Sequence, residues 1–308
     1  MHWFIYAIGA PVLWAMVNIA DHYLVKKSDE GDNPVGSLVI FSSIIGLFVA
    51  LAIFLFSNSS ISISGGGEFI LILAGIVNAL WIILYLYALS ADELSVVYPW
   101  FLTIPFFAYI FGYFFLGETL TQLQIIGGVI VCLGGVIISL EPAHLFAGRL
   151  RFKRQATLCM LSAAILAALG SVLFKFVAED AGFWASSFWE YLGLGVAGVI
   201  IFVCIATYRH GFFAMLKNGG MQIFTINATS ELATVAGNLL FRFATLLAPI
   251  ALVSLVEPIQ SVIVFAFAVV GTIFFPHIIK EDISKQVLMY KITAIAIMFF
   301  GSILLFRG

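Results

Sequence analysis

A stripe of polar side chains runs along one predicted helix of a chain whose other long segments are apolar. In the segment INATSELATVAGNLLFR (226–242), polar or charged residues recur at steps of 4, 3, 4 and 4 residues. At about 100° per residue, these side chains fall within roughly 80° of one another around a helix. The residues of this polar stripe are Asn227, Glu231, Thr234, Asn238 and Arg242.

Glu231 is the member of the polar stripe best placed for chemistry. It lies ten residues after Met221 and fifteen before Leu246, so it falls near the middle of a membrane-spanning helix. An ionisable residue at that depth is costly and faces either a partner or a cavity. Two interpretations stay open: a protonated carboxyl bonded to a neighbouring helix, or a cavity-facing acid that binds a cationic group or carries a proton.

Composition places the chain among the integral membrane proteins. Of its 308 residues, 63% are apolar and only 10% are charged, whereas soluble proteins carry about 25% charged residues. The net charge of −2 gives no reason to expect nucleic acid as a partner. We expect a small-molecule substrate, protons and membrane lipids, and a multi-pass location in a bacterial inner membrane. The oligomeric state stays open.

The sequence carries no motif typical of an enzyme or a cofactor site. The patterns HExxH, GxxxxGK[ST], CxxC and GxSxG are absent, and the five histidines are scattered over loops and helix ends. Without a metal cluster or an activated nucleophile there is no basis for catalysis. We therefore predict a protein that is not an enzyme and that binds no metal or cofactor.

Apolar segments of about 20 residues, the length needed to cross a membrane, predict an all-α fold with ten transmembrane helices. Five lie in residues 1–140 and five in residues 156–308, separated by a basic linker at 141–155. With an odd number per half, related halves must be inserted in opposite directions, and such inverted repeats place a substrate site at their junction. The predicted spans are 3–24, 36–56, 68–90, 94–116, 122–140, 156–177, 184–206, 221–246, 249–274 and 288–306.

A shift of 153 residues tests for such a repeat. It lays YPWFLTIPFFAYIFGYFF on ALVSLVEPIQSVIVFAFA and matches Pro105 with Pro258. It also lays a face of the third span on the polar stripe, which predicts two opposite walls of one central cavity. An aromatic wall opposite a carboxylate suits an amine or an aromatic amino acid. The matched pairs are Asn78 with Glu231, Trp81 with Thr234, Tyr85 with Asn238, Asn18 with Ser171 and His22 with Lys175.

Further polar residues lie near the helix ends. Asn18 and Asp21 share one face of the first span, so both are candidates for the same cavity. Asn238 and Glu257 lie at similar depth on adjacent antiparallel helices, and Arg242, nearer the turn that joins these helices, lies within reach of Glu257. Lys175 and Glu190 lie six and nine residues from a turn near Ala181 and form a second candidate pair. Each pair is either structural, or a gate or substrate clamp. Glu118, at a hairpin turn, is predicted to cap the fifth helix, where negative charge is favoured.

A pattern of short motifs runs through IPFFAYIFGYFFLGETLTQLQIIGGVIVCLGGVIISL (104–140). Its members are Pro105, Gly112, Leu116-Gly117-Glu118, Gln124, Gly127 and Gly134. This run resembles the EamA-like transporters of the drug/metabolite transporter superfamily. The segment VSLVEPIQSVIVFAFAVVG looks like a second, more divergent copy of the same pattern. The resemblance implies ten helices in two inverted five-helix halves, and transport of small metabolites through a central cavity.

The orientation in the membrane receives two opposite predictions. Lys and Arg gather in the odd-numbered connections, which by the positive-inside rule places those connections in the cytoplasm and both termini outside. The family resemblance implies both termini in the cytoplasm.

We predict a secondary active transporter, an exporter of a small metabolite such as an amino acid or amine, which works by alternating access with coupling to protons as an option. The alternative is a flippase for a polyprenyl- or lipid-linked head group, whose phosphate the basic residues 149–154 would attract. A third possibility is a membrane partner without transport. Predicted substrate-binding residues are Glu231, Asn238, Asn227, Thr234, Asn78, Trp81, Tyr85, Asn18 and Asp21; predicted gate or ion-pair residues are Arg242, Glu257, Lys175 and Glu190.

Overall fold

The described part of the chain consists of helices and contains no strand. The computed structural model describes residues 2–27, 34–57, 61–63, 65–91, 98–139, 154–218, 220–274 and 284–307. The predicted linker 141–155 lies outside these ranges except for its last two residues. The helices are α1 (His2–Lys27), α2 (Pro34–Phe56), α3 (Gly67–Ala91), η1 (Tyr98–Thr103), α5 (Ile104–Phe111), η2 (Gly112–Leu116), α6 (Gln122–Ser139), α8 (Arg154–Ala181), α9 (Phe183–Cys204), α10 (Ala206–Asn218), α11 (Gly220–Thr245), α12 (Ile250–Ser254), α13 (Ile259–Phe274) and α14 (Lys285–Arg307).

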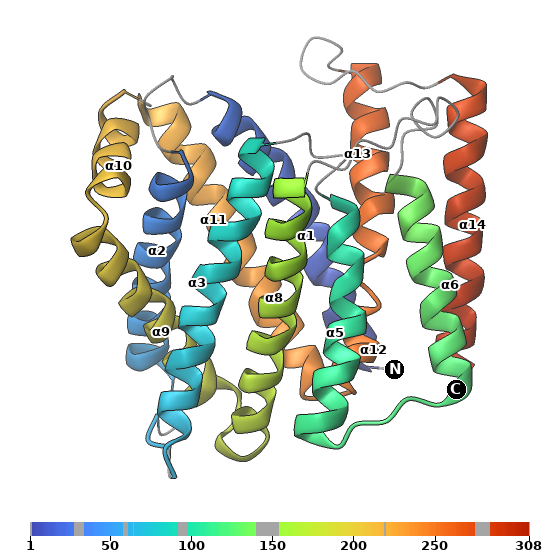
Figure 1. The fold of residues 1–308 in the computed structure, drawn as a ribbon, viewed down its shortest axis with the longest axis horizontal. Helices are drawn as coiled ribbons and strands as arrows, with labels where there is room; N and C mark the ends of the chain where they lie inside the picture. The colour runs from blue at the N-terminus through green and yellow to red at the C-terminus, as the bar shows by residue number, and fades with distance from the viewer. Residues whose placement is uncertain are drawn as a thin grey trace.

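The helices form an upright bundle whose outer surface is apolar. Within the described residues, six helices are long and apolar enough to cross a membrane. Large apolar side chains point outward, such as Phe56, Phe69 and Phe114 with 84%, 72% and 75% of their surface exposed. In water this surface would be an aggregation hazard, whereas in lipid it is the favourable solution. The chain is therefore an integral, multi-pass membrane protein, with both termini toward the lower end of the bundle in Figure 1.

Two of the predicted spans are broken helices. The segment predicted at 94–116 is built from the 3₁₀ helix η1, the short helix α5 and the π-helical turn η2, with Pro105 in the first turn of α5. The segment predicted at 249–274 is split into α12 and α13 by turn residues around Glu257 and Pro258. Proline lacks the amide that would continue the helix, which explains the position of this second break.

One helix was not predicted. The predicted spans 184–206 and 221–246 leave residues 207–220 as a connection between them, but the structure places α10 at Ala206–Asn218, packed against α2. Apolar residues such as Tyr208 and Phe212 are buried in this contact. The segment is helical because its apolar residues recur with a helical period around the polar ones.

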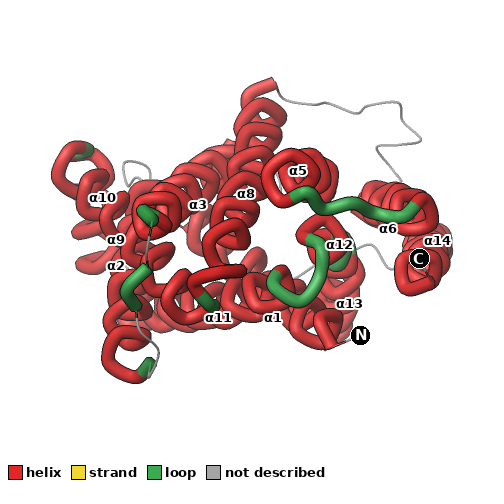
Figure 2. The backbone as a smooth tube through the Cα atoms, turned by 90° about the horizontal axis from the view of Figure 1, so that it is seen from below, coloured by secondary structure: helices red, strands yellow, loops and turns green. Residues whose placement is uncertain are grey.

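Four helices surround the centre of the bundle. The helix α3 packs along α8, and α1 packs along α11, as Figure 2 shows from below. The helices α2 and α9 pack together at one side, and α6 and α14 pair at the other. The central four helices therefore position most of the polar residues that the sequence analysis singled out.

Close packing of α3 on α9 brings the polar part of α9 to the centre. A Cβ on Gly75 would lie 2.1 Å from the carbonyl oxygen of Glu190, and one on Gly193 would lie 2.3 Å from that of Ile72. Only glycine at both positions allows the two backbones to approach this closely. The contact holds Glu190 and Tyr191, both buried, at the inner face of α9.

Candidate functional site

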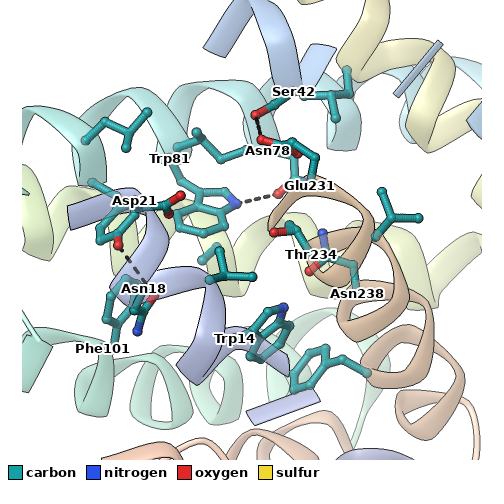
Figure 3. Close-up of a pocket in the computed structure, with 18 of the residues that line it drawn as sticks. Trp14, Asn18, Asp21, Ser42, Asn78, Trp81, Phe101, Glu231, Thr234 and Asn238 are labelled. Carbon is teal, nitrogen blue, oxygen red and sulfur yellow. Dashed lines mark hydrogen bonds between the residues drawn. The ribbon is translucent and has the colours of Figure 1, made fainter. Parts of the chain in front are cut away.

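A cavity of about 160 Å³ lies at the centre of the bundle. Its walls come from α1, α2, α3, η1, α5, α8, α9, α11 and the broken segment α12–α13, which are far apart in the sequence. Eight of the nine predicted substrate-binding residues line it: Asn18, Asp21, Asn78, Trp81, Tyr85, Glu231, Thr234 and Asn238. Figure 3, in which all of these except Tyr85 are labelled, shows the labelled residues converging from α1, α3 and α11.

Glu231 is held by a serine on a neighbouring helix. The hydroxyl of Ser42, on α2, donates a hydrogen bond to Oε1 of Glu231. This neutral partner orients the carboxylate toward the cavity without neutralising its charge. Ser42 was missed by the sequence analysis, where its single signal was a polar residue inside the apolar segment 36–56.

The wall from α3 is aromatic, as the sequence predicted. The ring centroids of Trp81 and Tyr85 lie 6.2 Å apart, and those of Tyr85 and Phe101 lie 5.3 Å apart. Trp81 Nε1 donates to Asn78 Oδ1. The Tyr85 hydroxyl lies 3.4 Å from Asn18 Oδ1, which ties this wall to α1. The aromatic rings thus form a fixed surface beside the carboxylates of the cavity.

A tryptophan of α1 completes the cavity wall next to α11. Trp14 lies three and four residues before Val17 and Asn18, and with Asn18 and Asp21 it forms one helical face that the sequence analysis recognised only in part. Its indole lies against Gly237, where a Cβ would come within 2.7 Å of Trp14 Nε1. Glycine at this point of α11 is therefore what lets the tryptophan approach the helix so closely.

Asn227 lies outside the cavity lining, contrary to the expectation for the polar stripe. It is 1% exposed, and its Nδ2 atom lies 3.9 Å from the Met215 Sδ atom of α10. The polar stripe curves away from the cavity at this end because α10, the helix that was not predicted, covers α11 there. The four other stripe residues line the cavity.

Arg242 pairs with Glu190, and the predicted pair with Glu257 does not form. Arg242 Nη2 lies 2.6 Å from Glu190 Oε1, and Arg242 Nε lies 3.3 Å from Glu190 Oε2, a bidentate arrangement. Arg242 Nη1 donates to Ser171 Oγ at 2.5 Å, and the guanidinium carbon lies 5.2 Å from the centre of the Phe174 ring. The face of α9 that carries Glu190 is turned toward Arg242, which depth along the helices could not show.

Lys175 pairs with Glu118, so the predicted Lys175–Glu190 pair is also wrong. Lys175 Nζ lies 2.5 Å from Glu118 Oε1 and 2.9 Å from the carbonyl oxygen of Ala248. The second carboxylate oxygen of Glu118 accepts the backbone amide of Ile250 at 2.8 Å. Glu118 therefore caps the first turn of α12, not the fifth helix as predicted.

The fifth helix has a cap of its own. At the start of α6, the backbone amide of Thr121 donates to Gln124 Oε1 at 2.9 Å, and the amide of Gln124 donates to Thr121 Oγ1 at 3.2 Å. This reciprocal arrangement is a capping box. It satisfies the helix terminus and leaves Glu118 available for its contacts with the second half of the chain.

Both charged clusters lie at one end of the cavity. This is the end where α8 and α11 finish and α12 begins, at the bottom of Figure 1. Ser171 and Arg242 line the cavity, and Lys175 lies one helical turn beyond Ser171 toward this end. We call these contacts of Arg242, Glu190, Ser171, Lys175 and Glu118 the ionic end of the cavity. Glu257 lines the cavity separately and is 8% exposed.

The side chains around the cavity are of types that bind organic groups. Among the described residues, no group of three or more His, Cys, Asp or Glu side chains could hold a metal ion. What the cavity offers is carboxylates, amides and aromatic faces.

The comparisons with known proteins agree with a membrane transporter. The model of the EamA-like transporter family, which belongs to the drug/metabolite transporter superfamily, matches residues 1–140. The protein is thus a membrane transporter of the drug/metabolite transporter type. The resemblance described above is confirmed, and residues 1–140 belong to the EamA-like transporter family.

One solved structure supports the fold over the whole chain. It is titled "Crystal structure of protein", and it matches with a TM-score of 0.63 at 14% identity, covering 98% of this chain and 96% of that one. At this identity the match bears on the fold alone. No curated protein matches the chain.

Proposed function

We propose that this protein is a secondary active transporter that exports a small metabolite, an amino acid or an amine, through the central cavity by alternating access. The observation that carries the proposal is the cavity itself. Buried or half-buried carboxylates and amides face an aromatic wall in the middle of an apolar bundle, where an unpaired charge is costly. A partner protein without transport would need no such space.

Two inverted repeats of five helices, in residues 1–140 and 156–308, supply the mechanism in this proposal. The 153-residue shift takes α1 onto α8 and α3 onto α11. It therefore turns the packing of α3 on α8 into the packing of α11 on α1, and both contacts exist. This exchange is what a pseudo-twofold axis through the cavity requires, and it supports a ten-helix arrangement in which the halves rock about a central site.

Glu231 is the residue we assign to proton exchange. Its carboxylate is bonded to a neutral serine, so its charge is balanced by a proton or by a cationic substrate. The charged or titratable side chains that share its cavity are Asp21 on α1, Tyr85 on α3, Tyr191 on α9, Arg242 on α11 and Glu257 beside α13.

Transport in proteoliposomes tests the proposal. A proton gradient should drive uptake of the substrate against the concentration gradient of the substrate. Glu231→Gln should make transport independent of the proton gradient. Asp180→Asn, which removes an exposed carboxylate at the end of α8, is the matched control and should behave as wild type. Transport by the Glu231→Gln variant with an unchanged pH dependence would show that Glu231 does not carry the proton. The flippase alternative stays a prediction, because most of the basic segment 149–154 lies outside the described residues.

A further inference from the structure

The charges that line the cavity do not balance. Three carboxylates belong to the lining, those of Asp21, Glu231 and Glu257. The described lining residues include one basic side chain, Arg242. If Arg242 were free, it would form a ready site for the carboxylate of an amino acid, because a guanidinium recognises a carboxylate through two parallel hydrogen bonds.

Arg242 is already occupied by the protein. Its Nε and Nη2 atoms both contact Glu190, and Nη1 donates to Ser171 Oγ at 2.5 Å. One face of the guanidinium lies over the ring of Phe174. A substrate carboxylate could use Arg242 only by displacing Glu190, a buried anion that would then lose its cation. The cavity therefore offers an anionic group no free cation within the described lining.

The other end of the cavity is built for a positive charge. Asp21 and Glu231 both project toward the space beside Trp81, from opposite sides, as Figure 3 shows. The rings of Trp81, Tyr85 and Phe101 line the same space. A cation over such rings gains from the negative charge of the ring face, and most of all where water is excluded.

One amide in this region has an unused donor. Asn18 is 6% exposed, and its Nδ2 atom has no hydrogen-bond partner among the described residues, although its Oδ1 atom accepts from Tyr85. A buried donor without a partner is costly, so a ligand oxygen that accepts from Asn18 would remove this cost. A neutral hydroxyl or carbonyl oxygen meets this need without bringing a negative charge near Asp21.

We propose that the substrate is an organic amine without a free carboxylate, whose ammonium group lies between Asp21 and Glu231 and whose apolar body rests on Trp81, Tyr85 and Phe101. The inference rests on the proposed transport function and narrows it: between the amino acid and the amine named above, the site selects the amine. The cavity, at about 160 Å³, is comparable with engineered protein cavities of about 150 Å³ that admit benzene. An amine of that size with an aromatic or short aliphatic body is therefore a fitting occupant.

Pairs of compounds that differ only by the carboxylate test this assignment. Suitable pairs are tyramine with tyrosine, tryptamine with tryptophan and cadaverine with lysine. Each compound is tested for thermal stabilisation of the purified wild-type protein and for transport in proteoliposomes. We expect binding and transport of the amine in at least one pair, with the amino acid of that pair at least about tenfold weaker, because its carboxylate must be buried beside two acids without a cation.

The outcomes separate the inference from the proposal beneath it. Transport of the amino acids without their amines would overturn the amine assignment and leave the transport function standing. If no compound of any pair binds or moves, both the amine assignment and the proposed transport of amines or amino acids are overturned. These arms use the wild-type protein, so the answer does not depend on whether a variant folds.

Substitutions locate the site within the cavity. Asp21→Asn should weaken amine binding about tenfold or more, because half of the anionic site is lost, while Asp180→Asn should leave it unchanged. Asn18→Leu should weaken a hydroxylated amine more than its analogue without the hydroxyl. Equal binding of tyramine by wild type and by a correctly folded Asp21→Asn protein would overturn the placement of the ammonium group.

Discussion

The two ends of the cavity are held together by different kinds of contact. At the ionic end, Arg242 with Glu190 and Lys175 with Glu118 join α8, α9, α11 and the start of α12 through directional bonds. At the opposite end, where α1 and α3 finish and α2 begins, the core is apolar and includes Leu24, Leu38, Phe41, Leu86 and Leu89. If the proposed alternating access holds, we expect the two ends to open by different steps, because an ion pair is lost as a whole whereas apolar side chains can slide past one another.

Positions related by the 153-residue shift show where this difference arises. Ser171 at the ionic end holds Arg242, whereas Asn18, its counterpart, accepts from the hydroxyl of Tyr85. Similar small polar residues therefore support an ion pair in one half and an aromatic wall in the other. Any repeat in this chain keeps the positions of polar residues better than it keeps their partners.

The largest expected effect on stability is at Arg242. Arg242→Met leaves Glu190 buried without its cation, which should lower the free energy of unfolding by about 3–5 kcal/mol. Thermal or denaturant unfolding in detergent measures the change. Lys217→Met, at an exposed lysine in the last turn of α10, is the control and should stay within about 0.5 kcal/mol of wild type.

A double substitution separates stability from function at the same place. Arg242→Met with Glu190→Leu removes both charges, so much of the lost stability should return, while closure of this end should stay defective. Equal stability of the single variant Arg242→Met and of Lys217→Met would show that the ionic end does not hold the bundle together.

A smaller effect is expected at Lys175. Lys175→Met removes the cation of Glu118, but the bond from the Ile250 amide remains, so the loss should be about 1.5–3 kcal/mol. Glu179→Gln is the matched control. Glu179 Oε1 lies 3.7 Å from Lys175 Nζ, and the Glu179 side chain is 53% exposed. Loss of this ion pair should therefore lower the free energy of unfolding by less than about 1 kcal/mol. A control that destabilises as much as Lys175→Met would contradict the ranking of the two contacts.

Access to the cavity should change when the ionic end is weakened. In a background without Cys132, Cys159 and Cys204, Thr234→Cys reports on the cavity wall. Adding Glu190→Gln should raise its labelling by a membrane-impermeant thiol reagent from the side of the termini, because Arg242 loses its charged partner. Unchanged labelling from that side would show that these pairs are not a gate.

The smallest effect is expected from a conservative change at the apolar end. Ile40→Val removes one buried methylene, and Ile40 is 2% exposed, so the cost should be about 0.5–1.5 kcal/mol. Labelling of Thr234→Cys from the side of the termini should not change. A large rise in that labelling would show that the two ends are mechanically coupled more strongly than their different packing indicates.

The sequence predicted the cavity walls better than it predicted the ion pairs. Helical period alone showed that Glu231, Thr234 and Asn238 share a face, and the 153-residue shift pointed to Asn78, Trp81 and Tyr85. Both signals depend on spacing within a helix, which the chain fixes locally. They failed only at Asn227, where α10 covers α11.

The ion pairs depended on information that spacing does not carry. Counting residues from a turn gives the depth of Arg242 or Lys175 along its helix, but not the direction in which the neighbouring helices lie. The partner of Lys175 comes from the connection between η2 and α6, 57 residues earlier in the chain. The break of the predicted span 249–274 near Pro258 was open to prediction, because the missing amide of proline is a local property.

The contact of Glu118 with Lys175 makes the two ends of the cavity different from each other. Glu118 belongs to the first half of the chain, while Lys175 stands where the 153-residue shift places His22 of that half. A homodimer of two copies of the first half would carry the same residues at both of its ends and could not tell one side of the membrane from the other. In the proposed arrangement of two inverted repeats, joining two unequal halves in a single chain allows an ion pair at one end of the cavity that the other end lacks, which gives the transporter a polarity that a symmetric dimer would not have.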